Sequence, residues 1–207
     1  MVRAIEKRNS EGYLALIAEY KRASPSGIVR LDLDPPWTYF NTVSKYAIGF
    51  SVLVEPIYFL GSPELIKIAL TYGKPVLYKD FVISREQIEE AGRLGVSSIL
   101  LIKRLLGDAL WDLVDYAISL GLEPLIEVDN EVDALDVVSK DSDVMLGINS
   151  RDLSDLSVSL DRAASIIRAV RGGKANIIVA ESGVKTVNDA LRLAREGGPM
   201  RCSWVRH

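Results

Sequence analysis

The stretch from residue 74 to residue 103 reads KPVLYKDFVISREQIEEAGRLGVSSILLIK. It begins with a short apolar run, residues 74–80, and ends with another, residues 97–103. Between them, residues 84–95 repeat apolar side chains at helical spacing and finish at Gly95, a common helix stop signal. Two strands that are apolar on both faces and joined through a helix form a parallel pair covered by that helix. The stretch therefore predicts one β-α-β unit of a parallel sheet.

The same alternation continues along the rest of the chain. Further strands are expected at residues 14–21, 46–55, 122–128, 143–149 and 175–183, and further helices at 108–121, 130–140, 160–173 and 186–198. Asn130 and Thr186 provide start signals for two of these helices. Because no linker or low-complexity segment interrupts the pattern, residues 1–207 are expected to form a single domain. Seven or eight such units are typical of an α/β fold of the TIM (β/α)8 barrel type.

The distribution of polar residues favours a closed barrel over an open, doubly wound sheet. An open sheet gathers its ligand groups at one switch point and usually begins with a glycine-rich turn, but the first turn here reads KRASPSG. Charged or amide residues instead follow one strand after another: Glu19 and Lys21, Glu55, Lys79, Glu127, Asn149, and Glu181 with Ser182. Such groups converge only when the sheet closes, so they predict a polar site at the mouth of a barrel.

The first strand carries two charges on one face. Residues 17–27 read IAEYKRASPSG, and the alternation of side chains along a strand places Glu19 and Lys21 on the same side. A buried strand has no structural need for an acid and a base at the same end. The two residues are therefore expected to line the barrel mouth, where an ion pair sets the positions of protons.

The composition excludes several classes of protein and site. A formal net charge of -3 without a basic stripe argues against nucleic acid as a partner, and no apolar run is long enough for a membrane span. The charged start, MVRAIEKRNSEG, differs from a secretory signal, so a cytoplasmic location is expected. A single cysteine, Cys202, and a single histidine, His207, exclude a Cys-rich or His-based metal centre, and no metal is expected. One glutamine among many charged residues is typical of thermophiles.

Seven blocks of sequence resemble the signature blocks of indole-3-glycerol phosphate synthase, a barrel enzyme of tryptophan biosynthesis. The blocks are IAEYKRASPSG, SVLVEPIYFLGS, PVLYKDFVISREQI, LLIK, PLIEV, GINSRDL and VAESGV, within residues 13–198. The resemblance implies ring closure of 1-(2-carboxyphenylamino)-1-deoxyribulose 5-phosphate, with loss of carbon dioxide and water and without a cofactor. It also implies a small phosphorylated substrate as the partner, with other tryptophan-pathway enzymes as further candidates.

By this resemblance, five residues are expected to carry catalysis. Lys79 is the expected general acid of ring closure, and Glu127 is an acid or base of the later steps. Glu19 is expected to hold the lysines in place, Lys21 to bind the substrate's carboxylate and share the dehydration step, and Asn149 to hydrogen-bond a substrate hydroxyl. Crowding of Lys21 and Lys79 in one cavity is expected to depress the pKa of both amines, which suits a lysine for acid catalysis.

The resemblance also implies eight substrate-binding residues. They are Phe59, Phe81 and Leu100 as an apolar slot for the aromatic ring, Glu181, Ser182 and Gly183 for the phosphate, and Ser24 and Arg151 as further contacts. The role of Lys103 is left open.

Residues 199–207, PMRCSWVRH, depart from the family and are interpreted as an aberrant tail. The family continues here with an apolar strand of the type D-A-V-L-V-G-S. Proline, arginine and tryptophan at these places do not suit a buried parallel strand, so strand 8 is expected to be missing or disrupted, with unpaired edges on the first and seventh strands. When the reading frame is shifted back by one base, the codons can spell Asp-Ala-Val-Leu-Val-Gly-Ser-Ala, and a frameshift is the preferred interpretation.

Two alternatives to an active synthase remain open. A truncated barrel could persist as an impaired or non-catalytic scaffold. A sister enzyme of the phosphoribosylanthranilate isomerase type shares the fold and the phosphate site, but it resembles a design with a Cys or Asp acid/base pair. No cysteine follows a strand in this chain. Formation of indole fluorescence from the synthase substrate distinguishes these readings.

Overall fold

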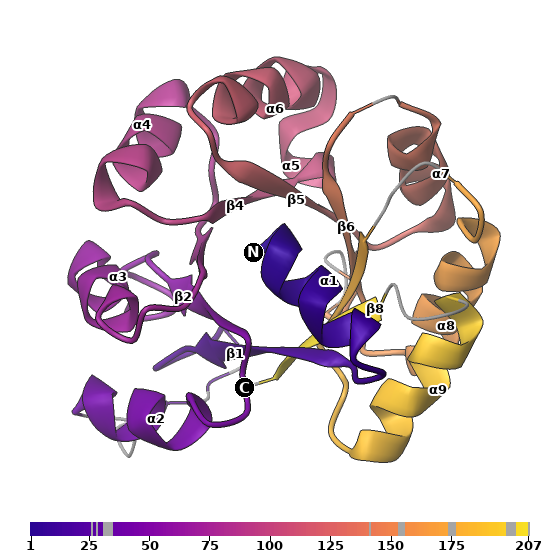
Figure 1. Cartoon of the computed structure of the whole chain (residues 1–207). Coiled ribbons are helices and arrows are strands. Elements are labelled where there is room, and N and C mark those ends of the chain that lie inside the picture. Colours follow the sequence, from indigo (N-terminus) through magenta and orange to yellow (C-terminus); the bar gives the residue numbers. More distant parts are fainter. Residues whose placement is uncertain are drawn as a thin grey trace.

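The computed structural model describes residues 1–25, 27, 29–30, 35–140, 142–152, 156–173, 177–197 and 202–206, the last segment for its backbone only. Eight parallel strands follow one another around a closed barrel in chain order (Figure 1). They are β1 (Ala15–Tyr20), β2 (Gly49–Leu53), β3 (Val76–Lys79), β4 (Ser98–Ile102), β5 (Glu123–Val128), β6 (Met145–Asn149), β7 (Ile177–Glu181) and β8 (Cys202–Arg206). The predicted TIM-barrel fold is confirmed.

Helices form a ring around the strands, as Figure 1 shows. The ring consists of α2 (Pro36–Val43), α3 (Pro63–Leu70), α4 (Arg85–Leu94), α6 (Leu110–Ser119), α7 (Glu131–Ser139), α8 (Leu160–Ala169) and α9 (Val187–Gly197). Two short turns, α5 (Lys103–Leu106) and η2 (Gly107–Ala109), lead from β4 into α6. The expected helices 84–95, 108–121, 130–140, 160–173 and 186–198 are confirmed to within a few residues, whereas α2 and α3 were not expected from the periodicity.

Local capping contacts explain where several of these helices begin and end. The side chain of Asn130 accepts a hydrogen bond from the Asp133 backbone N–H at 2.9 Å. The Thr186 hydroxyl accepts one from the Asp189 N–H at 3.1 Å. Gly95 ends α4 with a positive φ of 80°, a conformation that costs glycine little. The start and stop signals in the sequence therefore act as predicted.

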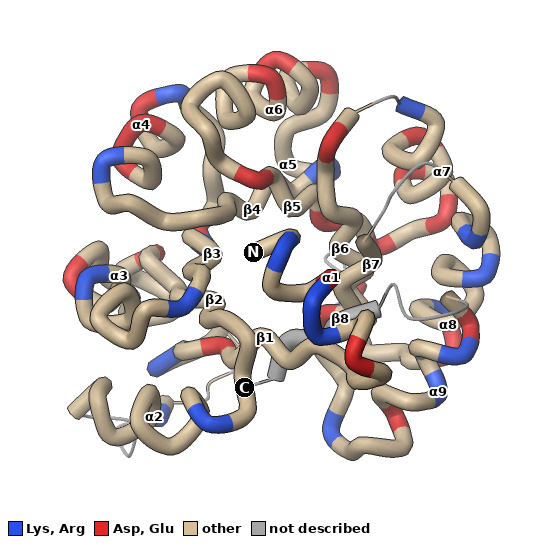
Figure 2. The backbone as a smooth tube through the Cα atoms, in the orientation of Figure 1, with Lys and Arg blue, Asp and Glu red and all other residues tan. Residues whose placement is uncertain are grey.

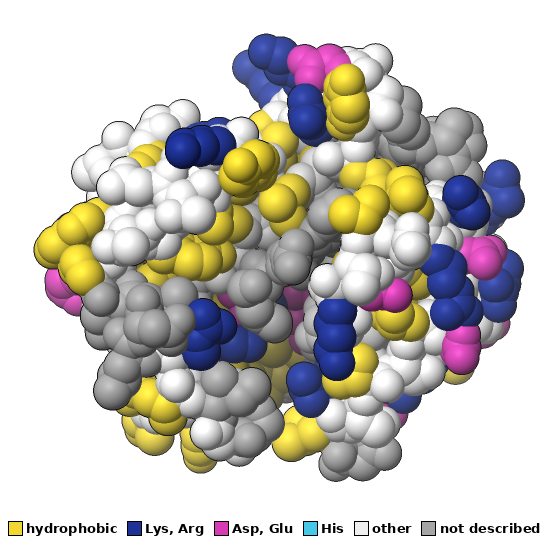
Figure 3. Space-filling view, turned by 90° about the horizontal axis from the view of Figure 1, so that it is seen from below, with side chains coloured by type: hydrophobic (Ala, Val, Ile, Leu, Met, Phe, Trp, Pro, Cys, Tyr) yellow, Lys and Arg dark blue, Asp and Glu magenta, His cyan; other side chains and the backbone are white. Residues whose placement is uncertain are grey.

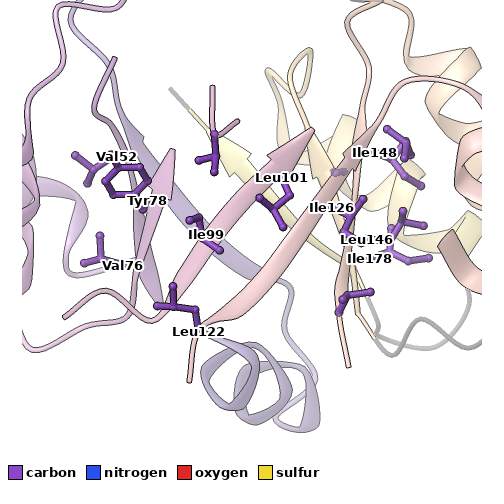
Figure 4. Close-up of a cluster of buried hydrophobic side chains, with 14 of the residues drawn as sticks. Val52, Val76, Tyr78, Ile99, Leu101, Leu122, Ile126, Leu146, Ile148 and Ile178 are labelled. Carbon is purple, nitrogen blue, oxygen red and sulfur yellow. The ribbon is translucent and has the colours of Figure 1, made fainter. Parts of the chain in front are cut away.

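The strands present apolar residues to both of their faces. On the outer face, a large buried cluster fills the space between the strands and the helices, and Figure 4 shows a part of it. Its labelled members are Val52, Val76, Tyr78, Ile99, Leu101, Leu122, Ile126, Leu146, Ile148 and Ile178. On the inner face, a second cluster fills the barrel toward the N-terminal ends of the strands. The barrel is therefore a packed core rather than a pore.

Helix α1 (Val2–Ser10) lies across the barrel instead of joining the outer ring (Figure 1). Its Ile5 is fully buried and belongs to the inner apolar cluster. The backbone N–H of Val2 donates a hydrogen bond of 3.0 Å to the carboxylate of Glu123, the first residue of β5. Because these contacts involve the starts of strands, α1 closes the N-terminal end of the barrel.

The eighth strand requires a correction to the sequence-based expectation. Cys202–Arg206 pair in parallel with both β1 and β7, so the backbone of strand 8 is present and no gap separates β1 from β7. Main-chain pairing depends on the backbone, and the proline that argued against a strand, Pro199, precedes the paired segment. Tryptophan and valine within the segment suit a strand. This pairing also provides hydrogen-bond partners for the backbone groups at the edges of β1 and β7, which would otherwise be unpaired.

Charged residues are found mainly on the outer helices (Figure 2). On the face drawn in Figure 3, the described Lys and Arg side chains lie among acidic and apolar ones and do not gather into one stripe. Within the part of the chain that the structure describes, every helix is too short or too polar to cross a membrane.

Candidate active site

A cavity of about 250 Å³ opens at the C-terminal ends of the strands. Most of the predicted site residues line it. From that set the lining contains Glu19, Lys21, Ser24, Phe59, Lys79, Phe81, Leu100, Glu127, Asn149, Arg151 and Ser182. The structure therefore brings together residues that are up to 163 positions apart in the chain, as the closed sheet predicts (Glu19 to Ser182).

Lys79, the last residue of β3, is held by two carboxylates. Its Nζ lies 2.7 Å from Oε2 of Glu181 and 3.0 Å from Oε2 of Glu19. Burial by itself would lower the pKa of Lys79, but the negative charges of Glu181, Glu19 and Glu127 outweigh burial and raise the pKa well above its ordinary value. The expectation that crowding would depress the pKa of Lys79 is therefore wrong, because its nearest neighbours are acids.

Lys21 lies on the same face of the chain, just beyond the end of β1. Its Nζ is 3.4 Å from Oε1 of Glu19, so one glutamate contacts both lysines. Burial lowers the pKa of Lys21, and the nearby charge of Lys79 acts in the same direction, although Glu19 opposes the change. The predicted depression of the pKa is thus confirmed for Lys21 alone, and the predicted ion pair with Glu19 is present.

Glu127 lies near the end of β5 and is almost completely buried. Its Oε1 accepts a hydrogen bond of 3.0 Å from Nδ2 of Asn149 on β6. Burial and the adjacent charge of Glu181 raise the pKa of Glu127 to about 8, although Lys79 opposes the change. At neutral pH this carboxyl group therefore carries a proton and can act as an acid.

Asn149 connects Glu127 to the loop that follows β6. While its amide nitrogen donates to Glu127, its Oδ1 accepts a hydrogen bond of 2.9 Å from the backbone N–H of Arg151. The Arg151 guanidinium donates to the carbonyl oxygen of Leu156 at 2.8 Å, across the same loop. The side-chain amide of Asn149 is thus fixed in one orientation, and the loop holds Arg151 at the cavity wall.

Two aromatic rings form the apolar side of the cavity. The ring centroids of Phe59 and Phe81 are 6.0 Å apart, and the ring planes are inclined by 44°. Leu100, on β4, lies on the same lining and is buried. An aromatic substrate ring fits a slot of this kind, because apolar surface is removed from water on both partners.

The loop that carries Phe59 is organised by Glu55. One oxygen of this carboxylate accepts a hydrogen bond from the N–H of Ile57 at 2.9 Å. The other oxygen accepts from the N–H groups of Tyr58 at 2.6 Å and Phe59 at 3.1 Å. The carboxylate therefore satisfies three consecutive backbone donors and fixes the position from which Phe59 reaches the cavity.

The segment after β7 turns sharply at Ser182 and Gly183. Both residues have a positive φ, 60° and 69°, and Ser182 lines the cavity. Gly183 does not line it, and a side chain on this glycine would contact Val158. By the resemblance, the Gly-Ser that ends the family's eighth strand falls at residues 204–205, where this chain has tryptophan and valine within β8.

The family described as "Indole-3-glycerol phosphate synthase" matches residues 2–199. The chain belongs to this family. A similar relative is an indole-3-glycerol phosphate synthase from Pyrobaculum arsenaticum, 50% identical over 174 residues that cover 84% of this chain and 68% of the relative.

Relatives of the same name come from distant organisms. One from Campylobacter fetus is 37% identical over 196 residues, covering 93% of this chain and 74% of the relative, and one from Clostridium acetobutylicum is 37% identical over 198 residues, covering 94% and 72%. The family match ends at residue 199, so the residues of β8 lie outside it. The thermophile-like composition agrees with the relatives from Pyrobaculum.

Several residues that line the cavity were not predicted from the sequence. They are Pro25, Leu53, Asp80, Ile102 and Leu156. Leu53 and Ile102 are the last residues of their strands, and each follows by two positions another residue that points into the barrel. The alternation of side chains along a strand could therefore have identified them. Leu156 is placed by a loop, for which no such rule exists. Lys103, on α5, is absent from the cavity lining. Its Nζ instead forms an ion pair of 2.5 Å with Asp136 on α7.

Proposed function

We propose that this chain forms indole-3-glycerol phosphate by closing, decarboxylating and dehydrating 1-(2-carboxyphenylamino)-1-deoxyribulose 5-phosphate. Membership of the indole-3-glycerol phosphate synthase family supports this activity, and no observation favours a scaffold or an isomerase. The central observation is the Lys79 ammonium, which two carboxylates hold in the lining of a cavity with one apolar side. A persistent cation at this point is suited to stabilise charge that develops on a substrate oxygen.

In the first step, the ring carbon that bears the substrate carboxylate attacks the ketone carbon. A carbon–carbon bond forms, and the carbonyl oxygen takes a proton from the Lys79 ammonium and becomes a hydroxyl. A developing alkoxide is more basic than an amine, so a lysine with a raised pKa still transfers its proton to it. The carbon–carbon bond to the carboxylate then breaks, carbon dioxide leaves, and the aromatic ring is restored.

In the last step, the new hydroxyl takes a proton from an acid and leaves as water, while the Lys79 amine left by ring closure takes the proton from the neighbouring carbon. The indole double bond forms, and the Lys79 ammonium is restored. We assign the acid of this step to Glu127, which holds a proton at neutral pH. Lys21, whose pKa is lowered by burial, is assigned to contact with the substrate carboxylate and to a share in the proton transfers. Asn149 is assigned to a substrate hydroxyl, since its amide lies between Glu127 and Arg151.

The remaining contacts follow from the shape of the cavity. Phe59, Phe81 and Leu100 are assigned to the aromatic ring, and Ser24 and Arg151 to polar groups of the substrate. Ser182 and Gly183 are assigned to the phosphate, because they form a turn with two consecutive positive φ angles directly after β7, where barrels of this type commonly bind phosphate. The proposed reaction uses no cofactor. Glu181 contacts Lys79 and is assigned to hold it rather than to bind phosphate directly.

The test is to incubate the purified chain with the substrate and to follow two products together. We expect indole fluorescence to rise with release of one molecule of carbon dioxide per indole formed. A heat-denatured sample of the chain provides the control. Consumption of substrate without carbon dioxide would indicate an isomerase, and no consumption with intact folding would indicate a non-catalytic scaffold.

A further inference from the structure

Gly147, the central residue of β6, faces the inside of the barrel. The neighbouring carboxylate of Glu181 explains why this position has no side chain. Gly147 lies between Met145, a member of the inner apolar cluster, and Asn149, which lines the cavity. Its φ lies outside the left-handed region, so the backbone conformation does not require glycine. A Cβ at this position would overlap Oε1 of Glu181. The glycine therefore provides space rather than flexibility.

The strand register explains how Glu181 reaches this space. Gly147 pairs with Glu127 on β5 and with Val179 on β7, while Glu181 is two residues farther along β7 and pairs with Asn149. The carboxylate of Glu181 thus reaches back over Gly147, toward the strand that carries Glu127. A methyl group on Gly147 would also lie 3.5 Å from Cα of Glu127, so little free room exists there.

The two oxygens of Glu181 have different surroundings. Oε2 accepts a hydrogen bond of 2.7 Å from Lys79, whereas Oε1 is buried and has no donor among the described side chains when both carboxyl groups are ionised. Besides Lys79, the carboxyl group of Glu127 lies within hydrogen-bonding reach of Glu181. Two carboxylates cannot share a hydrogen bond without a proton. A proton on Glu127 supplies the missing donor and satisfies the buried oxygen at the same time.

We propose that Gly147 is a positioning residue for this acid pair: its missing side chain leaves the space in which the Glu181 carboxylate contacts Glu127 while still reaching Lys79. The inference rests on the proposed function only for its effect on turnover. Without that space Glu181 is displaced from Glu127, and the carboxyl group of Glu127 loses the neighbouring negative charge that adds to burial in raising its pKa.

The first test needs no substrate, so it is independent of the proposed function. In Gly147→Ala, infrared spectra recorded across a pH titration report the carboxylic acid band of Glu127, which the Glu127→Gln variant identifies by its disappearance. We expect the band to titrate near pH 8 in the wild type and at clearly lower pH in Gly147→Ala, because Glu181 is displaced. The matched control is Gly92→Ala on α4, where a new methyl group would meet only Leu120 at 4.0 Å.

The second test uses steady-state kinetics. Gly147→Ala should lower kcat by roughly a hundredfold and leave KM within a few-fold, because a misplacement of about 1 Å affects the reacting groups more than binding. The double variant Gly147→Ala with Glu181→Asp shortens the acid that meets the new methyl group. It should recover part of both the titration and kcat, whereas Gly92→Ala should match the wild type.

Several outcomes would overturn the proposal. An unchanged titration of Glu127 in folded Gly147→Ala would do so, as would equal losses of kcat and of thermal stability with no rescue by the shorter acid. Failure of both the single and the double variant to fold would show that Gly147 serves the sheet rather than Glu181. If the wild type lacks synthase activity, the proposed function fails, while the infrared titration still decides the role of Gly147.

Discussion

The two ends of the barrel use the same strands in opposite ways. At the N-terminal end, β1, β3, β5 and β7 turn apolar residues inward: Ile17, Leu77, Leu125 and Val179. Two residues farther along, the same strands turn Glu19, Lys79, Glu127 and Glu181 inward. The backbone geometry is equal at both levels, so the side chains alone determine which end packs and which end reacts.

This comparison separates stability from chemistry within single strands. The apolar level excludes water and is closed by α1, so it supplies hydrophobic free energy. The charged level places three acids and one lysine in contact, an arrangement that contributes little to stability on balance. A substitution at one level should therefore affect a different measurement from a substitution two residues away on the same strand.

The largest expected effect comes from Lys79→Met. Turnover should fall by roughly 10²–10⁴-fold, because the proton donor of ring closure is removed, while substrate binding changes by less than about tenfold. Indole fluorescence and a substrate titration measure the two quantities. Lys103→Met, which removes another partly buried lysine that does not line the cavity, provides the control. More than a tenth of the wild-type turnover in Lys79→Met would remove Lys79 from the role of acid.

The matching change at the apolar level is Leu77→Ala, two residues earlier on β3. The free energy of unfolding should fall by about 2–5 kcal/mol, because a fully buried side chain leaves a cavity behind. Turnover of the folded fraction should remain within a few-fold. Chemical denaturation and kinetics at a permissive temperature separate the two. A loss of turnover comparable to that of Lys79→Met would show that the two levels are not independent.

A smaller effect is expected at the edge of the charged level. Lys21→Ala should weaken substrate binding by about tenfold through the loss of a contact with the substrate carboxylate. Turnover at saturating substrate should fall less than in Lys79→Met. Binding is measured by titration with the substrate in an inactive background such as Glu127→Gln. Unchanged affinity would end the carboxylate assignment.

A similar effect is expected at the last strand. Replacement of residues 199–206 with Asp-Ala-Val-Leu-Val-Gly-Ser-Ala should tighten substrate binding by about tenfold, since a Gly-Ser turn adds backbone donors for the phosphate. The control is the same eight-residue replacement with Val-Val in place of the Gly-Ser pair. Sequencing of the gene tests the frameshift separately, because third bases that cannot spell this strand exclude it.

The smallest effect is a pH dependence of stability. The pKa of Glu127 is about 8 in the folded chain and ordinarily 4.5, so the folded chain binds this proton more tightly. The contribution of Glu127 is therefore lost as the pH rises from about 4.5 to about 8. Over this range the Tm of the wild type should fall relative to that of Glu127→Gln, as measured calorimetrically. Parallel curves for the two proteins would contradict the assignment.

Sequence periodicity was sufficient for seven strands and for the polar residues at their ends, because alternation and position at a strand end are local properties. Ser24, Phe59, Phe81, Leu100 and Arg151 were expected only from the resemblance to the family. The end of β3 identified Lys79, and the end of β5 identified Glu127. The sign of the change in the pKa of Lys79 was missed, since it depends on which charges the closed barrel brings near.

Strand pairing explains another failure of the sequence analysis. Composition argued against β8, but the open edges of β1 and β7 provide pairing partners whatever the side chains are. The closure of the N-terminal end of the barrel by α1 was also missed. The helix has few apolar residues, and their role is evident only from their contact with the barrel interior.

The loop after β2 has a consequence for sequence change. Glu55 holds it through main-chain N–H groups, while the side chains of Ile57 and Tyr58 are 76% and 57% exposed. Evolution and engineering can therefore alter these two side chains widely without moving the aromatic wall at Phe59. Proline is the exception, because it removes the N–H on which the hold depends.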